Sequence, residues 1–297
     1  MRAYERARLV SYKIVIHTNI KTNMVRCQDI FYFDKPYILI YLSIKLDIKR
    51  KKVYPFYMKK QVFISGVSGD LGVSLLENFI KNDYFVIGQY CSNYEKIKEL
   101  SSIYSNQQVE FFQCDFSDVN LTEKFAKNIS LRYPNIEVMV NNAGVSQFGL
   151  LSDTSTEDML KIFNINLFSH IILTREISKN MVFNKKGNII NISSIWGNQG
   201  ASCEAIYSST KGGLEIFGKA LSKELGLSNI RVNNISCGFI QTKMNDRLSE
   251  TEIKDFCENL SLNRTCSPQE ISSVALFLAS NSSSYITGQT ISVDGGF

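Results

Sequence analysis

Features that would indicate a disulfide scaffold or a zinc site are missing from this sequence. The chain has seven cysteines, an odd number, and no two of them form a C-x-x-C pair. Scattered, unpaired cysteines are typical of reduced thiols in a cytosol rather than of a disulfide framework or a structural metal site. We therefore expect a cytoplasmic protein without a bound metal.

A long apolar run and a general basic surface are also missing. No stretch of 18 or more apolar residues occurs, so the sequence predicts no membrane-spanning segment. The formal net charge is +5, but residues 1–57 alone hold 12 Lys+Arg against 4 Asp+Glu. The remainder of the chain is slightly acidic, and this balance argues against nucleic acid as a partner.

Glycine is absent from residues 1–57, although the chain contains 17 glycines. The same segment carries an apolar run at 37–44 and the basic run "KRKK" at 49–52. Three interpretations stay open: a targeting or anchoring leader, a native arm, or sequence upstream of a true start at Met58. We favour the last, because in "MKKQVFISG" a basic dipeptide is followed at once by a buried strand, as at the start of a compact domain. We expect residues 1–57 to be poorly ordered.

Residues 58–297 alternate between strand and helix patterns and form one predicted domain. The expected strands are 61–65, 85–90, 109–114, 137–141, 188–192, 231–236 and 289–293. The expected helices are about 71–82, 93–104, 120–133, 156–180, 205–226 and 269–280. This alternation predicts a doubly wound α/β fold of Rossmann type, with a seven-stranded parallel sheet and helices on both faces. Ligands of such folds bind at the carboxyl ends of the strands. Residues 237–268 fit no element, and long loops in compact domains are often functional lids.

The stretch "VFISGVSGDLG" predicts a strand, a glycine turn and a helix. Gly66 allows the tight turn, Gly69 lets a pyrophosphate approach the backbone, and Gly72 lets the helix pack against the sheet. Asp70 puts a negative charge beside this turn. We expect its carboxylate to turn away from the pyrophosphate and to cap free N–H groups at the start of the helix.

Further positions suit a dinucleotide. Asp115 in "CDFSD" follows the third strand and suits the adenine amino group, and the small-residue turn "VNNAG" follows the fourth. The second strand ends in "GQYCSN", where a carboxylate would bind the ribose 2′-hydroxyl and favour NAD. Its absence favours NADP, with Ser92 and Asn93 as neutral donors to a 2′-phosphate, while NAD stays open as the cofactor.

The stretch "YSSTK" places Tyr207 and Lys211 on one helix face, 13 residues after Ser194 at the end of the fifth strand. A second such pair, Tyr94 and Lys98, has no comparable serine upstream. Reduction of a carbonyl develops negative charge on oxygen, which must be stabilised and protonated. A nearby lysine cation and an oxidised nicotinamide ring are expected to lower the pKa of Tyr207.

Together these motifs resemble the short-chain dehydrogenase/reductase family over essentially all of 58–297. The matching stretches are "SGVSGDLG", "CDFSD", "NNAG", "FNINL", "NISS", "YSSTK", "RVNNISCGFIQTKM" and "ITGQTISVDGG". The resemblance implies a catalytic tetrad of Asn166, Ser194, Tyr207 and Lys211, in which Asn166 holds a helix kink and a proton-relaying water. It implies cofactor contacts from Gly66, Ser68, Gly69, Leu71, Gly72, Ser92, Asp115, Phe116, Asn142, Ala143, Gly144, Tyr207, Lys211, Gly238, Ile240 and Thr242. It also suggests a homotetramer built on the long fourth and fifth helices.

Three positions depart from the pattern usual in the family. Asp70 stands where glycine is usual, and Gly69 replaces a basic residue found in many NADP-dependent members. Cys237 replaces a proline before Gly238, which frees a backbone N–H and is expected to loosen the hinge of the following loop.

Within the family the chain looks most like 3-oxoacyl-[acyl-carrier-protein] reductases. Their acidic carrier protein docks on basic residues, for which Lys185 and Lys186 are candidates, although a second basic position reads Ser228. An alternative is the 5-aminopentanone reductase that acts on elongation factor P, which "SSIWGNQGASCEAIY" resembles. There Glu204 would pair with the amine of the substrate, beside Ser194 as the residue that holds the carbonyl. A third hypothesis is a nucleotide-binding regulator or scaffold without activity; such proteins usually lack a member of the tetrad.

Overall fold

The computed structural model describes residues 14–19, 24–29, 44–47, 52–55, 59–245 and 248–297. The chain divides into two units, Met1–Met58 and Lys59–Phe297. In the first, β1 (Ile14–Asn19) pairs antiparallel with β2 (Met24–Asp29), and β3 (Ile44–Asp47) pairs with β4 (Lys52–Pro55). We expected little order in residues 1–57, and this stays a prediction; the residues described there form the four strands just named. The rest of 1–57 lies outside the described residues, and that this segment is not native stays a prediction.

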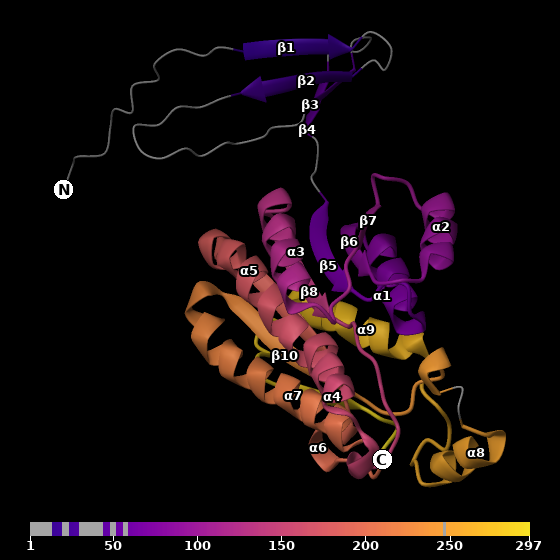
Figure 1. Cartoon of the computed structure of the whole chain (residues 1–297). Coiled ribbons are helices and arrows are strands. Elements are labelled where there is room, and N and C mark those ends of the chain that lie inside the picture. The colour runs from indigo at the N-terminus through magenta and orange to yellow at the C-terminus, as the bar shows by residue number, and fades with distance from the viewer. Residues whose placement is uncertain (1–13, 20–23, 30–43, 48–51, 56–58, 246–247) are drawn as a thin grey trace. The chain divides into compact units, whose positions relative to one another are not determined.

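The second unit is built on a seven-stranded, wholly parallel sheet, as predicted (Figure 1). Its strands are β5 (Lys60–Ser65), β6 (Tyr84–Tyr90), β7 (Val109–Gln113), β8 (Ile136–Asn141), β9 (Gly187–Ser194), β10 (Ile230–Cys237) and β11 (Thr290–Val293). Their order in the sheet is β11-β10-β9-β8-β5-β6-β7. The chain therefore winds in opposite directions from β5, and the strand order reverses between β5 and β8. Folds of this kind bind ligands at that point.

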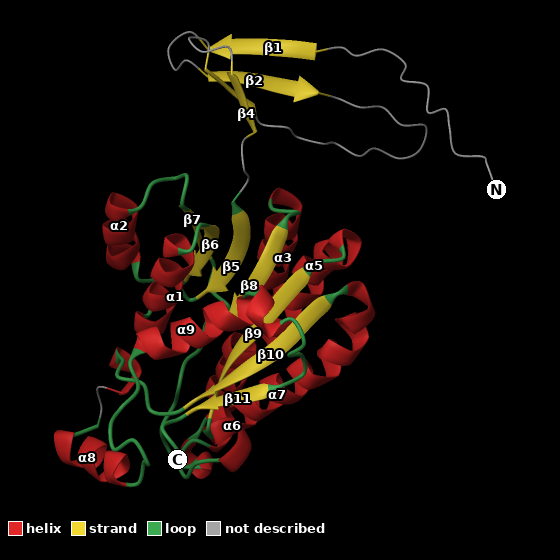
Figure 2. Cartoon of the chain, turned by 180° about the vertical axis from the view of Figure 1, so that it is seen from behind, coloured by secondary structure: helices red, strands yellow, loops and turns green. Residues whose placement is uncertain are grey.

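Helices cover both faces of the sheet, and they belong to two separate apolar clusters. One face carries α1 (Asp70–Lys81), α2 (Tyr94–Ile103) and α9 (Pro268–Ala279). The other carries α3 (Val119–Arg132), α5 (Ser169–Asn184) and α7 (Ala205–Leu225). Figure 1 shows the face of the sheet that α3, α5 and α7 cover. Figure 2 is the opposite view and shows the face that α1 and α9 cover.

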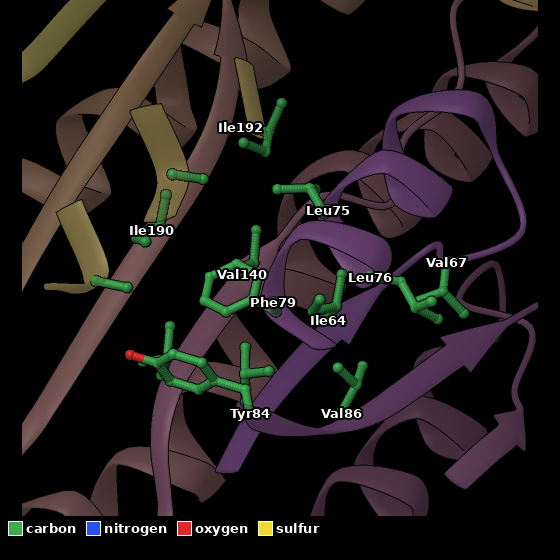
Figure 3. Packing of buried hydrophobic residues seen from close by; sticks show 14 of the residues in the cluster. Ile64, Val67, Leu75, Leu76, Phe79, Tyr84, Val86, Val140, Ile190 and Ile192 are labelled. Atoms are coloured by element: carbon green, nitrogen blue, oxygen red, sulfur yellow. The ribbon is translucent and has the colours of Figure 1, made fainter. Parts of the chain in front are cut away.

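The core beneath α1 shows how the sequence pattern produces this packing (Figure 3). Leu75, Leu76 and Phe79 recur at helical spacing, and all three are 0% exposed. They pack in one cluster with Ile64 of β5 and Val140 of β8. Parallel strands are buried on both faces, and for this reason they read as continuous apolar runs rather than alternating ones.

The structure differs from the predicted elements in three respects. The expected helix 156–180 is three pieces: α4 (Thr156–Phe163), a π-helical turn η2 (Asn164–Phe168), and α5. The stretch without a prediction, 237–268, holds the 3₁₀ turn η4 (Lys243–Asn245) and helix α8 (Glu250–Glu258). Other short elements were missed: η1 (Leu151–Asp153), α6 (Trp196–Gln199), η3 (Gly226–Ser228) and η5 (Asn281–Ser283). They are too short to show a hydrophobic period.

Among the residues that the structure describes, no helix combines the length and the apolar character needed to cross a membrane.

Replacing Leu75 by alanine tests the core. Leu75 is 0% exposed, whereas Leu131 on α3 is 83% exposed and serves as a control of the same residue type. We expect Leu75→Ala to lower the free energy of unfolding by about 2–5 kcal/mol, because it leaves a cavity. Leu131→Ala should change it by less than about 0.5 kcal/mol. Chemical denaturation of the purified protein measures both values, and equal losses would contradict the packing.

Candidate active site

The glycine turn between β5 and α1 requires glycine at two of its three positions. Gly66 has φ +70°, and a Cβ there would lie 2.9 Å from the Cα of Ala143. A Cβ on Gly72 would lie 2.0 Å from the carbonyl oxygen of Gly66, so α1 is in direct contact with the end of β5. Gly69 is different: its φ is −85°, and a Cβ would meet only the Gly66 oxygen at 3.7 Å. The protein's own packing leaves Gly69 open, as a surface for a ligand requires.

Two polar side chains that the sequence prediction missed hold this turn. Gln89, on β6, accepts from the N–H of Gly66 at 2.9 Å and donates to the carbonyl oxygen of Cys114 at 2.7 Å. Ser65 accepts through its hydroxyl from the N–H groups of Asn142 at 2.9 Å and Ala143 at 3.0 Å. The ends of β5, β6, β7 and β8 are thereby tied together. The sequence offered one signal for these two residues: each is a polar residue at the end of an apolar strand.

We predicted that Asp70 caps the start of its own helix, and this prediction was wrong. Its Oδ2 accepts from the backbone N–H of Lys243, in the loop after β10, at 2.7 Å. The N-cap residue of α1, Gly69, has no side chain to bond the first-turn N–H groups. These donors and the partial positive charge of the helix end suit a pyrophosphate.

The residues expected at the adenosine end gather beyond β6 and β7. Ser92 is exposed directly after β6, while Asn93 is engaged as the N-cap of α2, where its Oδ1 accepts from the Lys96 N–H at 3.2 Å. Asp115 Oδ1 accepts from the Ser117 N–H at 2.9 Å, and this bond lowers the pKa of the carboxyl group. The side chain of Phe116 is buried in the core, so the backbone is what it offers a ligand.

The catalytic residues expected from the sequence come together at the end of β9 and the start of α7. Ser194 is the last residue of β9, and its hydroxyl hydrogen-bonds Tyr207. Lys211 lies one turn further along α7, with Nζ 5.7 Å from the centroid of the Tyr207 ring. The same Nζ donates to the carbonyl oxygen of Ile192 at 2.8 Å.

The electrostatics of this group differ from the expected direction. Burial raises the pKa of Tyr207, and the hydrogen bond with Ser194 opposes that rise only in part. Burial also lowers the pKa of Lys211 to about 8. The predicted lowering of the tyrosine pKa by the lysine cation is therefore not found in the protein alone. Tyr207 keeps its proton, as a group that protonates a developing oxyanion must.

Asn166 sits in the π-helical turn, at the position of the predicted kink. It is 0% exposed, and its amide bonds the backbone of Val145 in both directions: Oδ1 accepts from the N–H at 2.9 Å and Nδ2 donates to the carbonyl at 2.8 Å. A Cβ on Gly144 would lie 3.5 Å from Lys211 Nζ and 3.6 Å from Asn166 Oδ1. Asn166 and Lys211 therefore flank one backbone turn. The proton-relaying water stays a prediction.

His170, on α5, is a further residue that the sequence prediction missed. Its Nε2 lies 2.8 Å from the carbonyl oxygen of Ala143, so this nitrogen carries the proton and donates it. Burial and the charge of Lys211 lower the pKa of His170 to about 3. The ring is thus neutral, and it positions the turn between β8 and η1 rather than transferring protons.

The loop after β10 covers the other side of the site. Gly238 packs against Asp294, whose Cα would lie 2.6 Å from a Cβ on this glycine. Ile240 bridges to Cys266, and Thr242 is half-buried. Cys237 ends β10 between Ser194 and Val293 in register, so it is part of the sheet. A looser hinge at this position stays a prediction.

Helix α8 is held beside the site by an aromatic cluster made of Trp196, Phe239, Phe256 and Phe297. The rings of Phe256 and Phe297 stack with centroids 5.3 Å apart, and Trp196 meets Phe297 edge-on at 5.5 Å. Trp196 follows Ser194 by two residues. Aromatic side chains therefore cluster close in sequence to Ser194, which the sequence alone did not reveal.

The residues present fit a nicotinamide dinucleotide. The α1 N-terminus without a side-chain cap, the open surface at Gly69 and the group around Lys211 all lie at the carboxyl ends of the strands. In the described part of the chain, no group of three or more His, Cys, Asp or Glu residues is arranged to hold a metal ion.

Comparison with known proteins places the chain in a family. A family model described as enoyl-(acyl carrier protein) reductase matches residues 66–297. The chain belongs to the short-chain dehydrogenase/reductase family and is an oxidoreductase. Its structure is similar to a short-chain dehydrogenase/reductase family protein, with TM-score 0.72 and 25% identity over 80% of this chain and 96% of that one.

Two relatives are similar over most of the chain. An uncharacterized oxidoreductase, YmfI, of Bacillus subtilis is 35% identical, over 81% of this chain and 99% of that protein. The 3-oxoacyl-[acyl-carrier-protein] reductase FabG of Chlamydia trachomatis serovar D is 36% identical, over 80% of this chain and 97% of that protein.

Alanine at Gly72 and at Gly69 separates packing from ligand contact. A Cβ at Gly72 overlaps the Gly66 carbonyl oxygen, whereas a Cβ at Gly69 has room. We expect Gly72→Ala to weaken NADPH binding by about tenfold or more through displacement of α1. Gly69→Ala should keep the wild-type melting temperature, and any loss of binding in it reports direct contact with the nucleotide. Fluorescence titration with NADPH measures both. Unchanged affinity in Gly72→Ala would contradict the assignment of this turn.

Proposed function

We propose that this protein is an NADPH-dependent reductase that converts a carbonyl to an alcohol on a 3-oxoacyl thioester. The observation that carries the proposal is the group of Ser194, Tyr207 and Lys211 at the carboxyl end of β9, next to a glycine turn suited to a dinucleotide. Reductases of this kind need a positioned carbonyl, a proton donor and a nucleotide in that arrangement.

The residues divide the chemistry as follows. NADPH, when bound, supplies the hydride that is added to the carbonyl carbon. Ser194 holds the carbonyl oxygen by a hydrogen bond, and Tyr207 delivers the proton that turns the developing oxyanion into a hydroxyl group. Lys211 stabilises the tyrosinate that remains, until a proton returns to it. The lowered pKa of Lys211 suits a group that passes protons near neutral pH.

Acyl carrier protein is the proposed carrier of the substrate. Relatives named 3-oxoacyl-[acyl-carrier-protein] reductase support it. The two lysines suggested for docking do not lie at the mouth of this chain's site, because they precede β9 and Ser194 ends it. Lys186 pairs with Glu137 at 2.7 Å, and Lys185 donates to Ser228 at 3.2 Å. These two lysines therefore do not support docking of a carrier beside this chain's own site.

The finer assignments are proposed together with this activity. NADPH is favoured over NADH because β6 ends without a carboxylate and Ser92 is exposed there. A homotetramer in the cytoplasm is proposed from the family. The exposed side chains of Phe168, Phe183 and Ile216, on η2, α5 and α7, provide apolar surface for it.

A second candidate substrate is a carbonyl compound with an amine, as on elongation factor P that carries a 5-aminopentanone group. The observation in its favour is the placement of Glu204. Glu204 is 7% exposed and lines a cavity of about 150 Å³, and its charge adds to the rise that burial causes in the pKa of Tyr207. A buried carboxylate whose charge acts on Tyr207 would suit a cationic substrate and offers nothing to a neutral acyl chain.

Replacing Tyr207 by phenylalanine tests the proposed reaction. Loss of the proton donor should lower kcat/KM for acetoacetyl thioester by about 10²–10⁴-fold while NADPH still binds. The matched control is Tyr94→Phe, from the second Y-x-x-x-K pair, whose side chain is 63% exposed. NADPH oxidation at 340 nm measures the rate, with an enoyl thioester as the comparison substrate. If wild type and Tyr207→Phe are equally inert and both bind NADPH, the protein is a nucleotide-binding scaffold.

Replacing Glu204 by glutamine separates the two substrate classes. If the amine is recognised, this change should raise KM for aminopentanone-modified elongation factor P by about tenfold and leave acetoacetyl-[acyl-carrier-protein] nearly unchanged. Glu157→Gln, an exposed acid on α4, is the control for charge alone. Steady-state kinetics with both substrates and with NADPH and NADH decide the question. Equal effects on the two substrates would exclude Glu204 as an amine-binding residue.

A further inference from the structure

The bond from Lys243 to Asp70 connects two segments that are 173 residues apart. Asp70 is the first residue of α1, directly after Gly69 of the glycine turn. Lys243 begins η4, directly after Thr242, the residue expected at the nicotinamide end of the cofactor. One hydrogen bond of 2.7 Å thus joins the part of the site that suits the pyrophosphate to the part that suits the nicotinamide.

Residues Ile240–Asn245 form one compact turn, because Asn245 binds back twice. Its N–H donates to the Thr242 carbonyl at 2.9 Å, and its Nδ2 donates to the Ile240 carbonyl at 2.8 Å. The start of this turn is attached to the body of the protein through Cys266, whose carbonyl accepts from the Gln241 N–H at 3.0 Å. Its far half reaches the glycine turn through Asp70. Any shift in that contact moves the Ile240–Asn245 turn as a unit.

We propose that Asp70 is a positioning residue, whose carboxylate fastens the Ile240–Asn245 turn to the glycine turn and so holds Thr242 over the nicotinamide site. The role rests on the proposed function, because it concerns where the cofactor's reactive end is held. It also explains why an acid is compatible with a nucleotide turn. The carboxylate faces the Lys243 N–H rather than the free N–H groups at the start of α1.

Two interactions stabilise the Asp70 carboxylate in this position, the helix dipole and a hydrogen bond. It lies at the amino end of α1, where the helix dipole stabilises a negative charge. It also accepts from the first N–H of η4, which has no acceptor within its own turn. Aspartate therefore suits both the amino end of α1 and the first N–H of η4. Glycine at this position would leave the Lys243 N–H without this hydrogen bond.

The test uses three variants of the full chain. Asp70→Ala and Asp70→Gly remove the acceptor. Asp70→Asn removes the same charge but keeps an oxygen that accepts from Lys243, so it separates the hydrogen bond from the charge. The first readout is hydrogen exchange of the Lys243 amide in the protein without cofactor, which needs no activity. Wild type and Asp70→Asn should protect this amide, and exchange should be about tenfold faster in Asp70→Ala and Asp70→Gly.

The second readout is kinetic. Asp70→Ala should raise KM for NADPH and lower kcat for the carbonyl substrate, whereas Asp70→Asn should keep both at their wild-type values. Each variant loses the helix-dipole interaction of the charge, so all of them should lower the melting temperature by a similar amount, about 1–4 °C. Equal exchange at Lys243 in Asp70→Ala and wild type would overturn the proposal. It would also fail if Asp70→Asn behaved like Asp70→Ala, since the charge would then be the cause. If the exchange pattern is as expected but wild type reduces no carbonyl, the positioning contact stands and only the proposed function falls.

Discussion

The contact between α1 and the end of β5 is the constraint on which the site depends. Gly72 lies so close to the Gly66 carbonyl that a methyl group would not fit, and this closeness holds the amino end of α1 against the carboxyl end of β5, the neighbour of β8 in the sheet. The strand order reverses there, so neighbouring connections leave in opposite directions and a crevice opens. Gln89 and Ser65 then fix the turn by hydrogen bonds to the backbone of the neighbouring strands. The position of the glycine turn is therefore set by the packing of α1 against the end of β5.

The catalytic end depends on a second set of buried contacts. Asn166 clamps Val145 from the π-helical turn, His170 binds the Ala143 carbonyl, and Lys211 binds the Ile192 carbonyl. Each polar side chain is buried and bonded to backbone, so none of these groups is free to move far without losing a hydrogen bond in a medium of low dielectric. The protein alone holds Tyr207 protonated and lowers the pKa of Lys211, and both effects come from burial. Tyr207 and Lys211 are therefore already held in place before a charged cofactor binds.

Much of the fold was predictable, because apolar runs and helical periods are local signals. Seven strands and six helices of the second unit were placed within a few residues of their observed bounds, apart from the division at Asn164–Phe168. That Ser194, Tyr207 and Lys211 lie together was also predictable from motif spacing, and the position of Asn166 from the family resemblance, while their catalytic roles stay a prediction. Residues that act through tertiary contact were not: Gln89, Ser65 and His170 carry no local pattern that distinguishes them from other polar residues near strand ends. The same holds for Trp196, whose partners Phe256 and Phe297 are distant in sequence.

Asp70 shows the boundary between the two kinds of information. The sequence by itself determined the alternation of strand and helix, the positions where glycine is needed, and the spacing from Ser194 to Tyr207 and Lys211, because these follow from local geometry and period. It also marked Asp70 as an unexpected charge, and local reasoning assigned it to the nearest donors, at the start of its own helix. Only the tertiary structure decided that the carboxylate binds Lys243 instead, because that donor is brought near by the return of the chain through β10. Long-range closeness is produced by the fold as a whole, and no window of sequence contains it.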